Sequence, residues 1–361
     1  MSKSLHTALE IGNLSIPNRV VMAPLTRRRA TSDHIPTPIM ATYYRQRASA
    51  GLLISEATPV SPQAVGYMNV PGIWNLQQAE GWKPVTRAVH EAGGRIFMQL
   101  WHVGRISHSL LQPDKVLPVS ASAISAGEII NTPEGHKKME VPRALESDEI
   151  QGIVNDFAEG AKRAIEAGFD GVEIHGANGY LIDQFLHSSS NARTDEYGGS
   201  IENRARFLFE VVEAVVKAVG SEKTGIRLSP SNIKNGMDDT DPSGLYTYVI
   251  SKLNDYGLSY LHLVEPMLPL DAHPHMIKEV TKFFRPVWKG PLITAGNYTP
   301  EKGEAAVEQG IADLVAYGRL YISNPDLPER MANKAPLNEP DTTTFYAGGE
   351  KGYTDYPVLQ N

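Results

Sequence analysis

The stretch IVNDFAEGAKRAIEAGFDGVEIHG, residues 153–176, contains the structural unit that decides the fold. Its first half repeats an apolar residue at every fourth position: Ile153, Phe157, Ala161 and Ile165. This spacing places the apolar side chains on one face of a helix. Gly168 follows, and glycine commonly ends a helix because it adopts a left-handed backbone without a Cβ clash. The apolar run at 172–174 then predicts a strand.

The same helix–glycine–strand unit recurs through the chain. Such glycines precede short apolar runs at seven places: Gly51, Gly93, Gly168, Gly220, Gly257, Gly290 and Gly310. The runs predict strands at 52–55, 96–100, 172–174, 226–228, 260–264, 292–294 and 314–316, and an earlier run at 19–23 supplies an eighth. Because the runs are continuous rather than alternating, they are typical of a parallel sheet buried on both faces. Eight strand–helix units favour an α/β protein with one (β/α)8 TIM barrel over a doubly wound sheet.

Three dipeptides predict helix starts, because each pairs an N-cap residue with proline at the first helical position: Asp241-Pro242, Thr299-Pro300 and Asn324-Pro325. Three segments lie outside the repeat. We expect a hairpin around Asn13, within 11–19, to cap the bottom of the barrel, and residues 335–361 to wrap around it as a tail. Residues 102–145 form a long, irregular, lid-like insertion after the third strand. All of 1–361 is therefore expected to form one domain.

Composition narrows the class of protein. The 361 residues are 41% hydrophobic and 21% charged, which excludes a disordered or fibrous chain. The net charge of −7 argues against a nucleic-acid or membrane-surface binder. We expect the run Arg27-Arg28-Arg29 to lie in a solvated loop.

Cysteine is absent, which excludes disulfides, thiolate nucleophiles, iron–sulfur clusters and cysteine-based zinc sites. No apolar run approaches the roughly 18 residues of a membrane span, and the first residues do not resemble a signal peptide. These features suit a cytoplasmic protein.

The carboxyl ends of barrel strands carry the chemistry of this fold. No lysine ends a strand, which argues against a Schiff-base aldolase, and the first strand has no His-x-His metal motif. Glu56, Glu173 and Glu265 leave a glycosidase-like carboxylate pair as an alternative.

The last two strands end in Gly296-Asn297 and Gly318-Arg319. Backbone N–H groups exposed by glycine, with a nearby cation, are typical of the barrel phosphate site. The alternative is two ordinary tight turns with a surface arginine.

Gln99 and Arg227 end the third and fifth strands. A glutamine matches the donor–acceptor edge of a pyrimidine-like ring, and an arginine beside such a ring stabilises negative charge on its reduced form. The alternative is a buried pair in which the two side chains satisfy each other.

His175, Asn178 and Tyr180 follow the fourth strand. Two donors that converge on a carbonyl oxygen stabilise an enolate, and a nearby phenol can supply a proton. The group is a poor metal site, because asparagine is an uncommon ligand and no partner carboxylate is evident.

At these residues the sequence resembles the Old Yellow Enzyme family, FMN-dependent NADPH ene-reductases built on a (β/α)8 barrel. The motifs are MAPLTR at 22–27, QLWH at 99–102, HGANGY at 175–180 and N-x-R-x-D-x-Y-G-G-S-x-x-N-R-x-R-F at 191–207. The resemblance extends from about residue 5 to 357. Thr26 stands where some relatives carry cysteine, which places the chain nearer the threonine-containing group.

The resemblance implies a role for each site residue. The flavin ring would be held by Ala23, Pro24, Thr26, Ala57, Gln99 and Arg227, with Thr26 near flavin O4. The FMN phosphate would be held by Gly296, Asn297, Gly318 and Arg319. His175 and Asn178 would bind the substrate carbonyl, and Tyr180 would protonate the substrate. The pocket would be lined by Tyr67, Trp101 and Tyr346. The charged residues of the longest motif would brace their loop: Arg193, Asp195, Arg204 and Arg206.

The implied activity is that of an NADPH dehydrogenase or ene-reductase, in which hydride passes from NADPH through flavin N5 to the β-carbon of an activated alkene. The family acts on α,β-unsaturated carbonyl compounds, maleimides, nitroalkenes and nitrate esters. No metal, nucleic acid or membrane partner is expected, and the protein would be a monomer or homodimer. The alternatives are a non-catalytic or sensory FMN-binding barrel and a flavin-free barrel hydrolase.

Overall fold

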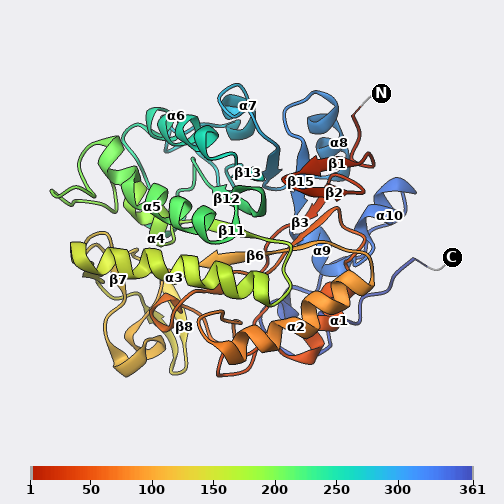
Figure 1. Cartoon of the computed structure of the whole chain (residues 1–361), viewed down its shortest axis with the longest axis horizontal. Coiled ribbons are helices and arrows are strands. Elements are labelled where there is room, and N and C mark those ends of the chain that lie inside the picture. The colour runs from red at the N-terminus through yellow and green to blue at the C-terminus, as the bar shows by residue number, and fades with distance from the viewer. Residues whose placement is uncertain (1–2, 360–361) are drawn as a thin grey trace.

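Eight parallel strands close into a barrel in the computed structural model, which describes residues 3–359 (Figure 1). The strands are β3 (Val20–Met22), β4 (Leu52–Ile54), β6 (Ile96–Trp101), β11 (Gly171–Gly176), β12 (Thr224–Leu228), β13 (Tyr260–Val264), β14 (Leu292–Ala295) and β15 (Leu314–Tyr317). Each strand pairs with the next, and β6 pairs with β11, so the ring has no free edge. The short β5 (Thr58–Pro59) adds to β6. The predicted (β/α)8 barrel is confirmed, with every strand where its apolar run lies.

A helix precedes each of the last seven barrel strands, and these helices surround the barrel (Figure 1). They are α1 (Pro38–Arg45), α2 (Leu76–Glu91), α3 (Ser147–Glu166), α5 (Ile201–Val219), α6 (Pro242–Leu253), α7 (Val280–Phe284) and α8 (Pro300–Glu308). Three further short helices, α4 (Leu181–Leu186), α9 (Arg319–Ser323) and α10 (Leu327–Ala332), follow β11 and β15. In α3 the apolar face packs into the core as expected, except that Ala164 is buried in place of the half-buried Ile165.

The glycines behave as predicted at five of the seven positions, where φ is positive: Gly93, Gly168, Gly220, Gly257 and Gly310. The prediction is wrong at Gly51 and Gly290, which are not in the left-handed region. These two positions need glycine for close approach instead, because a Cβ would clash with the Asn18 carbonyl at Gly51 and would lie 2.9 Å from the Trp288 ring at Gly290.

Two of the three predicted helix starts are confirmed. Asp241 caps α6 by accepting the Gly244 N–H, and Thr299 caps α8 by accepting the Lys302 N–H. The third is wrong, because Asn324 follows the end of α9 and α10 begins only at Leu327. The Asn324 side chain is bonded elsewhere, accepting the Asn338 N–H of the tail at 2.7 Å.

The hairpin at the start of the chain is confirmed as β1 (Leu9–Ile11) paired with β2 (Leu14–Ile16). Its Ile11 and Ile16 belong to a buried cluster with barrel-strand residues. The hairpin caps the bottom of the barrel, because a Cβ on Gly12 would clash with Glu222 and Ser259, which precede β12 and β13. The insertion at 102–145 is more regular than expected. It contains the parallel pair β7 (Val119–Ser120) and β10 (Arg143–Ala144), and a hairpin of β8 (Ile129–Thr132) and β9 (Gly135–Lys138). Gly135, at φ +89°, permits the tight turn of this hairpin.

The arginine run does not lie in a solvated loop, so that expectation is wrong. Arg27 is 1% exposed and Arg29 is 6% exposed. Both guanidinium groups donate to backbone carbonyls of the tail, including Gly352 for Arg27 and Thr344 for Arg29. Few backbone groups of the tail are paired within helices or strands. The several N–H groups of each arginine donate to the tail carbonyls instead. The tail also places Tyr353 in a stack on Tyr43, with ring centroids 4.0 Å apart.

Seven short 3-10 turns complete the described elements: Pro62–Ala64, Ser109–Leu111, Pro113–Lys115, Ser221–Lys223, Lys234–Gly236, Asn254–Tyr256 and Thr342–Thr344. Within residues 3–359, no helix is both long and apolar enough to cross a lipid bilayer.

Candidate active site

A buried polar group lies inside the barrel, midway along β6, β11 and β13. Gln99 donates from Nε2 to Glu173 Oε1 at 2.7 Å, and His262 Nδ1 lies 2.8 Å from Glu173 Oε2. Burial raises the pKa of Glu173, but His262, Arg227 and Gln99 together hold it below its usual value. Burial also lowers the pKa of His262, whose Nδ1 faces the Glu173 carboxylate. Gln99 is thereby held in a fixed orientation within β6.

Arg227 has a different environment from its neighbours. Its side chain is 9% exposed, and its buried Nε has no hydrogen-bond partner among residues 3–359. The idea that Gln99 and Arg227 satisfy each other is therefore wrong, because Gln99 bonds to Glu173. A buried guanidinium with an unsatisfied N–H is costly unless a ligand supplies the acceptor. Arg227 thus points to an electron-rich group bound beside it.

His175 lies at the end of β11, close to Arg227. Its Nδ1 accepts the backbone N–H of Ala177 at 3.3 Å, so the ring proton must lie on Nε2. Burial first, and then the charges of Arg227 and His262, lower the pKa of His175 well below its usual value. The side chain is therefore a neutral donor through Nε2–H at neutral pH.

Asn178 is held by its backbone, so its side chain is available. Its φ of +60° is a left-handed conformation that asparagine tolerates better than most residues. Its N–H donates to Ser229 Oγ at 2.7 Å, and its carbonyl accepts from Asn235 Nδ2 at 2.9 Å. The loop after β12 thus fixes the backbone three residues after His175.

A group of aromatic side chains lies beside these two donors. The Tyr180 ring lies edge-on to Trp101 and to His175, with centroids 4.9 Å apart in each case. Tyr67 stacks on Trp101 at 5.5 Å, and its hydroxyl lies 3.4 Å from that of Tyr180. Burial raises the pKa of Tyr180 well above its usual value, so the phenol keeps its proton. Tyr346, by contrast, is 59% exposed on the tail.

The loop after β3 carries Ala23, Pro24 and Thr26, and it is anchored by Glu56 at the end of β4. Glu56 accepts the Arg27 N–H at 3.3 Å and the Tyr44 hydroxyl at 3.4 Å. Ala57, next to Glu56, is 5% exposed. Sequence reasoning considered Glu56 only as a hydrolytic carboxylate and missed this positioning role.

A test of the Glu56 environment follows from its pKa, which burial raises to about 7 against the opposing effect of Arg27. Because the folded-state pKa lies above the unfolded one, this group stabilises the fold at low pH and loses that contribution as pH rises through 7. Glu56→Gln cannot ionise, so we expect its unfolding free energy relative to the parent to increase by up to about 3 kcal/mol between pH 4.5 and 8. Urea unfolding of both proteins at several pH values measures this difference.

The exposed Glu308→Gln serves as the matched control, with a difference that stays nearly constant over the same range. A Glu56→Gln difference that is equally flat would show that Glu56 has the same pKa in the folded and the unfolded protein, so that its buried environment does not oppose the charge.

The two glycine-containing strand ends lie side by side, because β14 and β15 are paired. Gly296 has φ +122°, and a Cβ there would lie 2.9 Å from Glu265. Asn297 also has a positive φ, of +55°. Arg319 is exposed and forms no ion pair within the described part of the chain.

The carboxylates of the hydrolase alternative are all bonded to protein donors. Glu173 binds Gln99 and His262, and Glu56 anchors the loop after β3. Glu265 accepts the N–H groups of Val280 and Thr281 at the start of α7, each at 2.8 Å. None of the three is positioned as one of a carboxylate pair flanking a substrate, so the geometry gives a hydrolase no support.

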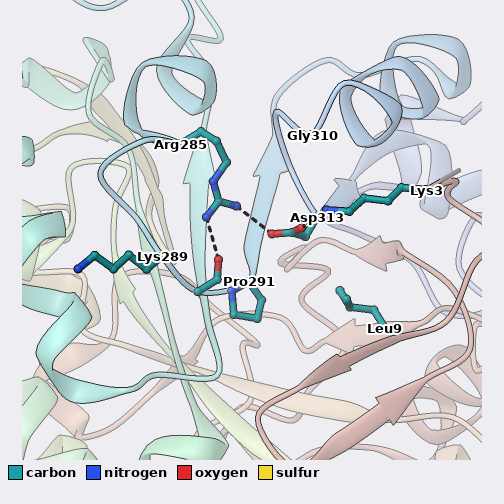
Figure 2. A pocket seen from close by; sticks show the side chains of 8 residues that line it. Lys3, Leu9, Arg285, Lys289, Pro291, Gly310 and Asp313 are labelled. Carbon is teal, nitrogen blue, oxygen red and sulfur yellow. Dashed lines mark hydrogen bonds and ion pairs between the residues drawn. The ribbon is translucent and has the colours of Figure 1, made fainter. Parts of the chain in front are cut away.

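A surface depression lies away from this site, beside the starts of β14 and β15 (Figure 2). It has a volume of about 490 Å³ and is wide open to solvent. Its Arg285 and Asp313 pair with each other at 2.9 Å. Because chemistry in this fold lies at the carboxyl ends of the strands, we assign this depression no catalytic part.

The charged residues of the longest motif form ion pairs and hydrogen bonds that hold their segment in place. Arg193 pairs with Asp195 and donates to the Ala121 carbonyl at 3.1 Å. Arg204 pairs with Asp239 at 3.0 Å, and Arg206 donates to the Glu196 carbonyl at 2.8 Å. These contacts tie the loop before α5 to the insertion and to the loop after β12.

Comparisons with known proteins agree with this geometry. A model of the NADH:flavin oxidoreductase / NADH oxidase family matches residues 4–338. The 12-oxophytodienoate reductase 1 of Oryza sativa subsp. japonica is 48% identical over 359 residues, which cover 99% of this chain and 93% of the relative.

Two solved structures are similar over almost their whole length. Morphinone reductase in complex with tetrahydroNAD superimposes with a TM-score of 0.93 at 50% identity, covering 99% of this chain and 98% of that one. The Old Yellow Enzyme homologue from Zymomonas mobilis has a TM-score of 0.95 at 45% identity, covering 99% of this chain and all of that one. With the barrel and the residues at its strand ends, these matches show that the chain belongs to the Old Yellow Enzyme family of FMN-linked oxidoreductases.

Proposed function

We propose that this protein is an ene-reductase that uses FMN and NADPH to reduce the carbon–carbon double bond of α,β-unsaturated carbonyl compounds. The observation that carries the proposal is the juxtaposition of a neutral His175 Nε2–H donor with the protonated Tyr180 phenol, ring centroids 4.9 Å apart, in a buried aromatic site. Asn178, three residues after His175, supplies a second donor from the same loop.

The residues present fit FMN. The buried, unpartnered Nε of Arg227 and the fixed amide of Gln99 suit the pyrimidine edge of the ring, with Ala23, Pro24, Thr26 and Ala57 along the neighbouring strand ends. The paired strand ends at Gly296-Asn297 and Gly318-Arg319 offer backbone N–H groups and a cation for the phosphate. FMN held by these residues would supply the hydride chemistry that links the nicotinamide to the alkene β-carbon.

The side chains of the protein bind the substrate and supply the proton. His175 and Asn178 donate hydrogen bonds to the substrate carbonyl oxygen, which draws charge from the β-carbon and stabilises the enolate. Tyr180 holds its proton at neutral pH and donates it to the α-carbon. Tyr67 and Trp101 enclose the substrate, and Tyr346 stands at the outer edge of the site. The aromatic enclosure excludes water.

Substrate breadth and reductant are further parts of the proposal. Maleimides, nitroalkenes and nitrate esters share with enones an oxygen that accepts two hydrogen bonds. NADPH remains the predicted reductant, although the morphinone reductase complex contains tetrahydroNAD, so NADH is compared directly. A cytoplasmic location and a monomeric or homodimeric state also remain predictions, and light scattering of the purified protein distinguishes the two states.

The test is the colour of the flavin. The purified protein should be yellow, should bleach under anaerobic NADPH, and should recolour when cyclohexenone is added. A sensory FMN-binding barrel would stay yellow or bleached without converting the enone. A colourless protein that cannot be reconstituted with FMN would overturn the proposal.

A further inference from the structure

A second cluster of polar side chains lies on the loops after β12 and β13, outside the groups described above. Asp238 comes from the first of these loops, and His273 and His275 come from the second. Since β12 and β13 are neighbours in the barrel, their following loops meet at the same rim. The ligand-capable atoms of the three side chains all lie within 4.8 Å of one another.

Both imidazoles face the same carboxylate, one at each oxygen. His275 Nε2 lies 2.7 Å from Asp238 Oδ1, and His273 Nδ1 lies 3.4 Å from Asp238 Oδ2. Two nitrogens and an oxygen bound to one ion at roughly 2.0–2.2 Å would be separated by about 3.0–3.4 Å. With all ligand-capable atoms within 4.8 Å of one another, small side-chain movements would bring one atom from each residue to that spacing.

The charge of the cluster favours a cation. Within residues 3–359, Asp238 forms ion pairs with no lysine or arginine, and its only basic partners are the two histidines. With neutral imidazoles the cluster carries one negative charge. The neighbouring Asp239 is already paired with Arg204, so it does not compete for the ion.

The backbone holds the cluster in place from both sides. Asp238 donates its N–H to Ser189 Oγ at 2.8 Å, and its Oδ1 accepts the Asp239 N–H at 2.8 Å. Pro274 stands between the histidines and restricts the backbone of both itself and His273. On the second loop, the N–H of Ile277 donates to Ser231 Oγ at 3.0 Å. Ligands fixed in this way lose little freedom on binding an ion.

We propose that Asp238, His273 and His275 form a binding site for a divalent transition-metal ion, with Zn²⁺ the ion of first choice. Two imidazoles and one carboxylate suit Zn²⁺, Ni²⁺ and Cu²⁺, whereas Mg²⁺ and Ca²⁺ prefer oxygen ligands. On binding, the proton of each coordinating ring nitrogen moves through solvent to the other nitrogen of that ring. The side chains of Asp238 and His275 are 40% and 39% exposed, so water completes the coordination.

The site adds a structural link to the catalytic rim. The loop that carries Asp238 also carries Asn235, whose side chain donates to the Asn178 carbonyl at 2.9 Å. An ion bound across the loops after β12 and β13 would restrain the segment that supports Asn178. The proposal itself concerns ion binding and does not depend on the ene-reductase activity.

The experiment is a calorimetric titration of the tag-free, FMN-loaded protein with ZnCl₂, and with MgCl₂ in parallel. We expect one saturable Zn²⁺ site and no Mg²⁺ binding. Asp238→Asn, His273→Ala and His275→Ala should each weaken Zn²⁺ affinity by at least about 10-fold. His136→Ala, an exposed histidine on β9 outside the cluster, is the matched control and should bind like the parent.

A protein with no saturable Zn²⁺ site, or variants of the cluster that bind as tightly as the parent, would overturn the proposal. Bound flavin and the far-ultraviolet circular dichroism spectrum establish that each variant is folded. Where one histidine variant does not fold, the other histidine variant and Asp238→Asn decide the result. Because affinity is the measured quantity, a failure here is distinguishable from a failure to reduce alkenes.

Discussion

His175→Ala is expected to slow alkene reduction by about 10²–10³-fold, the usual cost of losing one oxyanion donor. The structure supplies the reason, since Ala177 N–H occupies Nδ1 and the only available proton lies on Nε2. Without this donor the developing enolate oxygen loses a preorganised hydrogen bond. Enone binding should weaken in parallel, whereas FMN should remain bound. Asn178→Ala is expected to act in the same direction.

The measurement is steady-state conversion of cyclohexenone together with the rate at which the NADPH-bleached protein recolours. His136→Ala is the matched histidine control, because this exposed side chain lies in the hairpin of the insertion. Its rates should equal those of the parent. If either His175→Ala or Asn178→Ala kept full activity, the carbonyl-binding assignment would be wrong.

Tyr180→Phe should leave bleaching by NADPH nearly intact but slow alkene reduction by about 10²–10⁴-fold, the range for loss of a general acid. The phenylalanine ring keeps the edge-on packing against Trp101 and His175, whose centroids lie 4.9 Å away. Only the hydroxyl is lost. Since burial raises the pKa of Tyr180, the parent phenol is protonated and able to donate at any neutral pH.

Stopped-flow measurement of the two half-reactions separates these effects. Tyr197→Phe is the matched control, because it removes a hydroxyl that bonds to Glu210, at 3.1 Å, away from the site. It should change neither rate. Equal slowing of bleaching and recolouring in Tyr180→Phe would count against a proton-donor role and indicate a general disturbance of the site.

The residues at the strand ends show how much of the site can be predicted from local sequence patterns. Gly168 and the four-residue apolar spacing before it predict a helix followed by a strand from sequence neighbours alone. Once that unit repeats into a closed parallel ring, topology brings the strand ends to one rim. His175, Asn178 and Tyr180 are close in sequence, so their grouping was predictable. The grouping of Gln99 and Glu173 was not, because the contact joins two strands 74 residues apart.

The predictions from sequence that were wrong involve polar side chains whose hydrogen-bond partners are distant in the sequence. The Arg27-Arg28-Arg29 run has the composition of a solvated loop, yet the tail covers it and supplies carbonyls for Arg27 and Arg29. Asn324 has the sequence of a helix cap but binds Asn338 in the tail. In both cases the hydrogen-bond partner lies too far along the sequence for a local sequence pattern to reveal it.

The sequence by itself determined the barrel, the order of its strands and the residues at their ends, because hydrophobic periodicity and glycine act over a few neighbouring residues. Only the tertiary structure decided the protonation of His175, the absence of a hydrogen-bond partner for Arg227 Nε among the described residues, and the proximity of Asp238 to His273 and His275. Those properties depend on burial and on charges from other strands and loops, and a linear pattern does not encode these distances.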